Sequence, residues 1–414
     1  MEERKLTKED IDRVRNFEGF PIAKDEDIIA LSRPPYYTAC PNPFIEDFIR
    51  EHGTPYDEVT DDYHREPFAV DVSEGKGEPI YRAHSYHTKV PYKAIMRYLL
   101  HYTKPGDVIF DGFCGSGMLG VAADMCENAD TTLKMQLSQE LKEAEWGKRY
   151  AIIGDLSPIA SFISACFNIK HEEPYQISSK LEQMLAICHK NSDWMYETFH
   201  IVNGHFVNDK NEHPIIGRIN YVIWSDVLVC PSCSNEIVFW DVAVDRPNGR
   251  INREFSCLCC NSRLKKSDCE HAWETYYDSE IGESATIAKI VPVIINYSVG
   301  KAKYEKQPDE NDIDVLNRIA TWKIPWFAPT NKWPEGEKTQ EPIKLGIERI
   351  HQIYIKRSLV ALASIYDYCC ENGLMAVLTK IVFRLTKMYR LTYQGGTWSW
   401  WGANEWYSIY SIAH

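Results

Sequence analysis

Apolar residues recur at helical spacing in the segment that begins at Pro91. Four of them would share one face of a helix, namely Ile95, Met96, Leu99 and Leu100. The breaker Pro105-Gly106 would end this helix, and the apolar run Val108-Ile109-Phe110 that follows is typical of a short buried strand. The pattern therefore predicts a helix, a turn and a strand in this segment.

A glycine-containing turn follows this strand and leads into a second predicted helix, from Met118 to Met125. The unit then repeats. Tyr150 to Ile153 has the pattern of a strand, Asp155 ends it, and Ser157-Pro158 starts a helix through Cys166, with serine as the N-cap and proline in the first turn. Repeated strand and helix units are typical of a parallel, doubly wound sheet, so the predicted fold class is α/β.

Other parts of the chain differ in pattern. Paired cysteines mark a module between Trp224 and Cys269, Val291–Tyr297 has the pattern of a buried strand, and Ile347–Tyr368 has that of a helix. The stretch from Trp398 shows neither period. We therefore expect a poorly periodic N-terminal extension, the first half of an α/β core, an inserted module, and a remaining α/β region with an atypical tail, at residues 1–80, 81–215, 216–275 and 276–414.

Composition narrows the class of protein. With 414 residues, 44% of them hydrophobic, the chain is long enough for two or three packed units. No window approaches the roughly 18 apolar residues of a membrane span, and the first ten residues are charged, so we expect a soluble, cytoplasmic protein with no membrane partner. The net charge of -13 argues against coating nucleic acid by bulk electrostatics, which leaves a local basic patch as the means of contact.

The strongest local signal is the run from Phe110 to Gly117, which lies between a predicted strand and a predicted helix. Glycines at positions 112, 115 and 117 allow the backbone to turn sharply and leave no Cβ where a ligand would approach. The backbone N–H groups at the start of the following helix would face that ligand. A tight connection alone would also use such glycines, so the neighbouring motifs decide between the two interpretations.

The sequence resembles the amino-methyltransferases of bacterial restriction–modification systems, whose cofactor motif reads Asp-Pro-Phe-x-Gly-Ser-Gly. Gly112 stands here where proline is usual, and the rest of the motif matches. An upstream His-x-Thr-x-Lys-Pro motif of the family is similar to the shorter run from His87 to Pro91, which also precedes a helix and a Pro-Gly-Asp turn. The resemblance covers about residues 83–163.

This resemblance implies a Rossmann-like methyltransferase sheet that binds S-adenosylmethionine. The residues that it assigns to the cofactor are His87, Thr88, Lys89, Asp111, Gly112, Phe113, Gly115, Ser116, Gly117 and Asp155. Asp155 closes the second predicted strand, where an acidic residue usually accepts hydrogen bonds from ribose hydroxyls about 20 residues after the glycine turn. The segment before Asp155 is longer than that, and a role as a helix cap is the alternative.

The reaction that the resemblance implies is methyl transfer to an exocyclic amine of a DNA base, adenine N6 or cytosine N4. Because a sulfonium donor is already activated, placement of the amine matters more than acid–base groups. Two alternatives stay open: a methyltransferase that acts on RNA, and a zinc-containing DNA-binding fragment that holds the cofactor without transferring a methyl group.

Family members hold the target amine with an Asp/Asn/Ser-Pro-Pro-aromatic motif, whose ring stacks on a base flipped out of the duplex. Pro34, Pro35 and Tyr36 come closest here, but Arg33 precedes them and has no acceptor capacity. A proline turn is the alternative interpretation of this run. We therefore expect a truncated or split methyltransferase, in which a second polypeptide supplies the acceptor motif.

Two Cys-x-x-Cys pairs in the inserted module predict a zinc ribbon. Thiolates from Cys230, Cys233, Cys257 and Cys260 would complete a tetrahedral site, with Cys259 and Cys269 as alternatives in the second pair. A site of four thiolates has no open position, which makes the predicted zinc structural rather than catalytic. Redox chemistry is the weaker interpretation, because neither pair starts a helix beside a strand–helix–strand unit.

The same module carries a local excess of positive charge. Against one acid, Glu254, it holds Arg246, Arg250, Arg253, Arg263, Lys265 and Lys266. This patch predicts contact with the phosphates of double-stranded DNA, although a purely structural knuckle is the alternative. A second basic stretch consists of Lys380, Arg384, Lys387 and Arg390. Its pattern is more typical of a solvated helix face than of a binding surface.

Overall fold

The computed structural model describes residues 4–32, 34, 37, 39–53, 56–72, 77–84, 86, 89–169, 173–334, 336, 339–387, 389–394, 397–402 and 409–413. The chain divides into two compact units, Met1–Ala69 and Val70–His414. Among the described helices, none has both the length and the apolar character needed to cross a membrane.

Three helices form the first unit: α1 (Lys8–Val14), α2 (Asp25–Leu31) and α3 (Ile45–His52). The hydroxyl of Thr7 accepts a hydrogen bond from the Asp10 N–H, and the Asp10 carboxylate accepts one from the Thr7 N–H, so that the pair caps α1. The helices are too short for apolar periodicity to reveal them, which is why the sequence indicated only an extension. Their small core consists of Leu6, Ile11, Ile28 and Tyr37.

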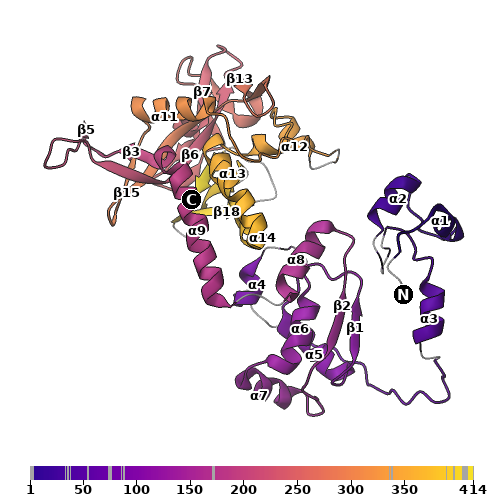
Figure 1. The fold of residues 1–414 in the computed structure, drawn as a ribbon. Coiled ribbons are helices and arrows are strands. Elements are labelled where there is room, and N and C mark those ends of the chain that lie inside the picture. The colour runs from indigo at the N-terminus through magenta and orange to yellow at the C-terminus, as the bar shows by residue number, and fades with distance from the viewer. Residues whose placement is uncertain are drawn as a thin grey trace. The chain divides into compact units, whose positions relative to one another are not determined.

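The second unit begins with an α/β region (Figure 1). Its elements are α4 (Pro79–Ala83), α5 (Tyr92–Tyr102), β1 (Val108–Asp111), α6 (Met118–Asn128), α7 (Thr131–Glu140), β2 (Tyr150–Ile153) and α8 (Pro158–Asn168). β1 and β2 pair in parallel, which places their carboxyl ends side by side. The predicted helices and strands are confirmed as α5, β1, α6, β2 and α8, whereas α4 and α7 were not predicted. The Ser157 cap is also confirmed, because its hydroxyl accepts a hydrogen bond from the Ala160 N–H.

The two faces of this two-stranded sheet are covered unequally. One face, which carries Ile109 and Ala151, packs against a core formed by α5, α6 and α7. On the other face, Phe110 is 76% exposed and Ile152 is 58% exposed. Both faces of a parallel sheet are ordinarily buried, so the described residues supply only one of the two covering layers.

A large antiparallel sheet dominates the rest of the unit. Its central strand is β6 (Ile216–Val229), which pairs with β15 (Ile290–Val299), and β15 pairs in turn with β16 (Ala302–Lys306). The buried strand predicted at Val291–Tyr297 is therefore confirmed. The other strands of this nine-stranded sheet are β3 (Glu197–Phe199), β7 (Glu236–Val238), β12 (Glu270–His271), β17 (Tyr389–Gln394), β18 (Thr397–Gly402) and β19 (Ile409–Ala413).

The last two strands, β18 and β19, correct the expectation that the chain lacks strand structure from Trp398 onward. Pairing of β19 with β6 joins segments far apart in sequence, and local periodicity does not register such a partner.

Helices pack against this sheet to form a core around Met195, Tyr297 and Val360. They are α11 (Glu310–Thr321) and α13 (Lys356–Glu371), together with the 3₁₀ turns η1 (Asp193–Tyr196) and η4 (Phe383–Leu385). A second core joins α13 to α9 (Pro174–Ser192) and α14 (Met375–Val382). The unit also contains α12 (Gln340–Ile343) and the 3₁₀ turn η3 (Ile350–Ile353). The predicted helix at Ile347–Tyr368 is thus a 3₁₀ turn followed by α13. The predicted basic helix face is wrong, because α14 ends at Val382 and Lys387, beyond it, is buried.

The module with the paired cysteines consists of short elements attached to β6. They are α10 (Phe239–Ala243), β8 (Val244–Asp245), β9 (Arg250–Ile251), β10 (Glu254–Ser256), β11 (Arg263–Lys265) and η2 (Lys266–Asp268). Two further hairpins are β4 (Ile201–Val202) with β5 (His205–Phe206), and β13 (Trp273–Asp278) with β14 (Glu283–Ala288).

Candidate functional site

The turn after β1 adopts left-handed backbone at two glycines. Gly115 has φ +52° and Gly117 has φ +74°, conformations that other residues rarely adopt. A Cβ at Gly117 would overlap the hydroxyl of Ser164 and lie 2.7 Å from the amide nitrogen of Asn168. Glycine therefore lets the start of α6 approach α8 closely, and the Asn168 amide holds this contact by donating to the Gly117 carbonyl at 3.0 Å.

Backbone hydrogen bonds join this turn to the end of β2. The Gly154 N–H donates to the Asp111 carbonyl at 2.9 Å, and the Cys114 N–H donates to the Gly154 carbonyl at 3.0 Å. The Gly115 N–H then donates to the Asp155 carboxylate at 2.9 Å. The structure thus brings together the glycine turn and Asp155, which the resemblance assigned to one cofactor site although 40 residues separate Gly115 from Asp155.

The Asp155 carboxylate also accepts a hydrogen bond from the Ser157 N–H at 2.9 Å. Hydrogen bonds from the N–H groups of Ser157 and Gly115 lower the pKa of Asp155 below its usual range, because they favour the charged form. The cap of α8 itself is Ser157, so Asp155 supports the helix start without being its N-cap. Its ionised carboxylate retains lone pairs that can accept hydrogen bonds from a ligand hydroxyl.

Three more of the predicted cofactor residues belong to the turn. Asp111 accepts a hydrogen bond from the Phe113 N–H at 3.0 Å, which fixes the first bend. The Phe113 ring is 92% exposed, whereas Ser116 is buried at the helix start. Phe113 therefore offers an apolar surface at the mouth of the turn, and Gly112, between it and Asp111, adds no side chain.

The upstream run is described in part, since His87 and Thr88 lie outside the described residues. The Lys89 ammonium donates to the carbonyl oxygens of Tyr81 and His84, and burial lowers the pKa of Lys89. Lys89 thereby ties the run to the end of α4. Sequence reasoning missed Tyr86: a Cβ at Gly115 would lie 2.9 Å from the ring carbon Cε1 of Tyr86, so this ring packs on the glycine turn. The place of Tyr86 directly before His87 was the available signal.

The candidates for the acceptor site, Pro34, Pro35 and Tyr36, are described only in part. Pro34 lies in a turn of the first unit, and Pro35 and Tyr36 lie outside the described residues.

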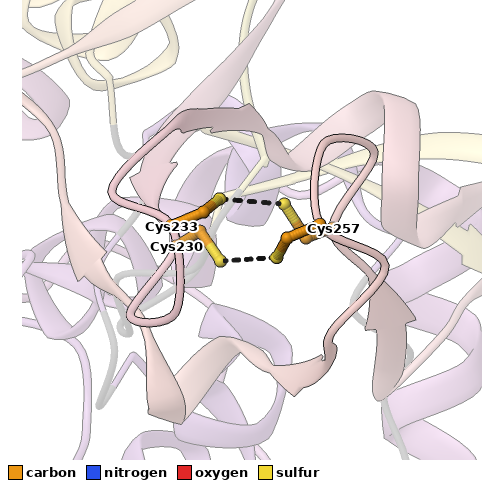
Figure 2. Close-up of side chains that lie close together, drawn as sticks. Cys230, Cys233 and Cys257 are labelled. Atoms are coloured by element: carbon orange, nitrogen blue, oxygen red, sulfur yellow. Dashed lines mark hydrogen bonds between the residues drawn. The ribbon is translucent and has the colours of Figure 1, made fainter.

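The four predicted zinc ligands come together. The Sγ atoms of Cys230, Cys233, Cys257 and Cys260 all lie within 4.8 Å of one another. The Cys233–Cys257 and Cys230–Cys260 separations are both 3.7 Å, and Figure 2 shows thiols of the two pairs pointing toward each other. A tetrahedron with Zn–S bonds of about 2.3 Å has edges of about 3.8 Å, so the donor set fits zinc in chemistry and size.

The two pairs are held by equivalent turns. In the first, the Cys230 N–H donates to the Asn235 carbonyl and the Ser234 N–H donates back to the Cys230 carbonyl. Cys257, Asn261 and Ser262 repeat this pattern in the second turn. Ser234 and Asn261 occupy matching left-handed positions, with φ +57° and +59°. The repeat presents two thiols from each turn in the same way, as a two-knuckle metal site requires.

Hydrogen bonds in the first turn lower the pKa of one of the four thiols. The backbone and side-chain N–H groups of Asn235 lower the pKa of Cys233 to about 6, which favours the thiolate that binds metal. The alternatives to Cys260 lie elsewhere: the Cys259 Sγ accepts a hydrogen bond from the Asn235 amide at 2.8 Å, and the Cys269 Sγ contacts the Lys265 carbonyl at 3.7 Å.

Most of the predicted basic patch is paired with carboxylates. Arg246 pairs with Glu305, Lys266 with the buried Asp226, and both Arg263 and Lys265 with Glu254. In the described part of the chain, Arg250 and Arg253 form no ion pair. The positive charge available to an external anion is therefore smaller than the sequence indicated, and it lies at β9 and the turn after it.

Comparison with protein families gives one finding for part of this chain. Residues 20–143 match the model of the N6/N4 methylase family, described as DNA methylase. The match includes the glycine turn and the run from His87 to Pro91, and it ends before Asp155 and before the four clustered cysteines. Neither the curated proteins nor the solved structures yield a match. The resemblance of residues 20–143 to the adenine and cytosine amino-methyltransferases is therefore confirmed.

Proposed function

We propose that this chain is the S-adenosylmethionine-binding part of a methyltransferase that modifies an exocyclic amino group, adenine N6 or cytosine N4, in double-stranded DNA. The observation that carries the proposal is the hydrogen bond from Gly115 to Asp155, which places an ionised carboxylate beside a left-handed glycine turn. The family match over residues 20–143 supports DNA as the substrate.

The chemistry of the described residues supports a cofactor site at the glycine turn. The turn from Asp111 to Gly117 offers backbone without side-chain bulk, and Asp155 would accept hydrogen bonds from ribose hydroxyls. The bound cofactor would supply an activated methyl group. The protein's part is to hold and orient it: His87, Thr88 and the backbone of Gly112, Gly115, Ser116 and Gly117 would line the site, Asp111 and Phe113 would shape its mouth, and Lys89 would hold the upstream run in place.

Calorimetry on the zinc-replete protein tests this proposal. We expect S-adenosylmethionine to bind to the wild type and to bind more weakly to Asp155→Ala. Glu127→Ala is the matched control, because Glu127 is an exposed carboxylate near the end of α6, away from the turn. Absence of binding to the wild type would refute the proposal.

The acceptor motif would come from a second polypeptide. The half-covered sheet supports this part of the proposal, because β1 and β2 expose apolar side chains on one face. A hollow of about 940 Å³ lies on the other side of the sheet, the side that carries Ala151, and is lined by Val121, Ile153 and Phe167, so it is separate from this exposed face. Residues 81–215 would then be the first half of a Rossmann-like sheet that the partner completes. If the neighbouring DNA encodes no Asp-Pro-Pro-aromatic segment in any frame, this idea fails.

Residues 216–275 would form a structural zinc ribbon that contributes DNA contacts from Arg250 and Arg253, and residues 276–414 would complete the surrounding α/β region. A filter assay with tritiated S-adenosylmethionine, offering DNA and RNA side by side, separates the alternatives. Label on DNA supports the proposal, and label on RNA favours an RNA methyltransferase. Cofactor binding without transfer, with the partner polypeptide present, favours a DNA-binding fragment.

A further inference from the structure

A cavity of about 370 Å³ lies in the second unit, between β13, α11 and the segment η3–α13. Its volume falls in the range of small-molecule sites in proteins. The cavity lies outside residues 20–143, and neither the cofactor site nor the cysteine cluster uses it.

Aromatic and aliphatic side chains form the apolar walls. Trp224, Tyr276 and Tyr354 contribute rings, and Ile290 and Leu316 contribute aliphatic surface. The hydroxyl of Tyr276 donates to the Asp278 carboxylate at 3.4 Å, which fixes the orientation of that ring. Such walls suit a planar ligand that can stack on an aromatic face.

One side of the cavity has polar groups that are mostly paired, although within the described residues the buried His351 Nδ1 and Arg357 Nε have no hydrogen-bond partner. Asp278 pairs with His351 at 2.8 Å and accepts a hydrogen bond from Gln352 at 3.1 Å. Lys356 pairs with Glu280. These pairs give a rigid wall and leave little capacity for a ligand.

Lys387 is different. Its side chain is 8% exposed, and within the described residues its ammonium donates one hydrogen bond, to the Gln352 carbonyl at 2.9 Å, and forms no ion pair. An ammonium has three donors, and leaving buried donors unpaired costs free energy. Burial lowers the pKa of Lys387 to about 8. The cavity thus presents a cation with unused donors.

Glu274 supplies the complementary group. It lines the same cavity from β13 and interacts electrostatically with Lys387, and no side chain in the described part of the chain donates a hydrogen bond to it. Burial raises the pKa of Glu274. The cavity therefore combines aromatic walls, one acceptor with two oxygens and one multiple donor.

We propose that this cavity binds guanine. The Glu274 carboxylate would accept hydrogen bonds from the ring N–H and the amino group of the base, and Lys387 would donate to its carbonyl oxygen, while the aromatic walls stack on the ring. Adenine offers the carboxylate one amino group and no ring N–H on that edge, so it would leave an acceptor unpaired. A free nucleoside and an unstacked base in DNA present the same edge.

The test is calorimetric titration of the zinc-replete protein with guanosine, adenosine and cytidine. We expect guanosine to bind at least tenfold more tightly than the others, and Glu274→Gln and Lys387→Met each to weaken its binding at least tenfold. Glu283→Gln is the matched control, because Glu283 is an exposed carboxylate on the neighbouring strand, outside the cavity, and should bind as the wild type does. Lys387→Met keeps the length of the side chain, and a thermal unfolding curve shows whether each variant remains folded.

A single-stranded oligothymidine with one central guanine identifies the source of the base. Guanine-dependent binding that Glu274→Gln abolishes assigns the cavity to DNA, whereas binding of guanosine alone assigns it to a free nucleoside or nucleotide. If the wild type binds no guanosine, binds adenosine equally, or if the folded Glu274→Gln variant binds guanosine as the wild type does, the proposal is overturned.

Discussion

The N–H of Gly115 donates to the carboxylate of Asp155 at 2.9 Å, and this bond links the turn after β1 to the end of β2. Because Gly115 has left-handed backbone, its N–H is held in one direction, and the carboxylate stays anchored without a side-chain partner. The site is therefore assembled by main-chain geometry, and the predictions below test its consequences.

Replacing Asp155 with alanine should weaken S-adenosylmethionine binding by about tenfold to a hundredfold, as expected for lost hydrogen bonds to a charged group. The pKa of Asp155 is lowered by N–H groups in the folded state. The contribution of this ionised carboxylate is thus present above the ordinary carboxyl range, near pH 4, and is lost only as the pH falls through the lower, folded-state value. Calorimetry from pH 8 to pH 5 should show a flat contribution from Asp155, and a loss of affinity specific to the wild type within that range would contradict the assignment.

Gly117→Ala should destabilise the second unit by about 1–3 kcal/mol, because the methyl group would overlap Ser164 and the backbone has φ +74°. Gly154→Ala is the matched control: no atom lies within 4 Å of a Cβ at Gly154, and its φ is not positive. Urea unfolding measures both variants. Equal stability of the two would show that the contact between α6 and α8 is looser than described.

The cysteine cluster should bind one zinc ion per chain, and Cys233→Ser should abolish that binding. Cys259→Ser should retain it, because the Cys259 thiol accepts a hydrogen bond from Asn235 and lies outside the four-thiol cluster. Cobalt substitution reports the result, since four thiolates around cobalt give intense charge-transfer absorption. Chelation should unfold the ribbon, as metal binding stabilises such small sites. Loss of metal from Cys259→Ser would instead assign the second pair to Cys257 and Cys259.

Charge reversal at Arg250 and Arg253 should weaken DNA binding to all sequences alike and reduce the slope of log affinity against log salt by about 2, or roughly 0.9 per phosphate contact. Arg263→Gln serves as the control, because Arg263 already pairs with Glu254 at 2.5 Å. Filter binding from low to moderate salt gives both slopes. An unchanged slope in the double variant would exclude the ribbon from the DNA interface.

The sequence predicted α5, β1, α6, β2 and α8 closely, because each of these elements has a local signal, but it did not predict α7. Ser157 caps α8, Pro105-Gly106 follows the end of α5, and the apolar residues of α5 recur at helical spacing. The thiols of the metal site were likewise predictable, since their spacing within each pair determines a turn. The Cys-x-x-Cys spacing favoured Cys260 over Cys259, and the structure places Cys260 in the cluster.

The antiparallel sheet could not be predicted in the same way. β6 is stabilised by pairing with β15 and β19, which are distant in sequence, and its long apolar run gives no partner or direction. The basic residues show a similar limit. From the sequence, Lys266 is expected to be a surface charge, but in the structure it pairs with the buried Asp226 of β6. Lys387 is expected on the exposed face of a helix, but α14 ends at Val382.

The uncovered apolar row of β1 and β2 also has a kinetic consequence. Exposed apolar side chains such as Phe110 and Ile152 associate with apolar segments of other proteins, including nascent chains that have not yet folded. A complementary half would have to be synthesised together with this chain. One mRNA that encodes both in succession would shorten the time for which this apolar face is exposed to solvent. Yield of unaggregated protein should therefore depend on the order and timing of expression as much as on the stability of either half.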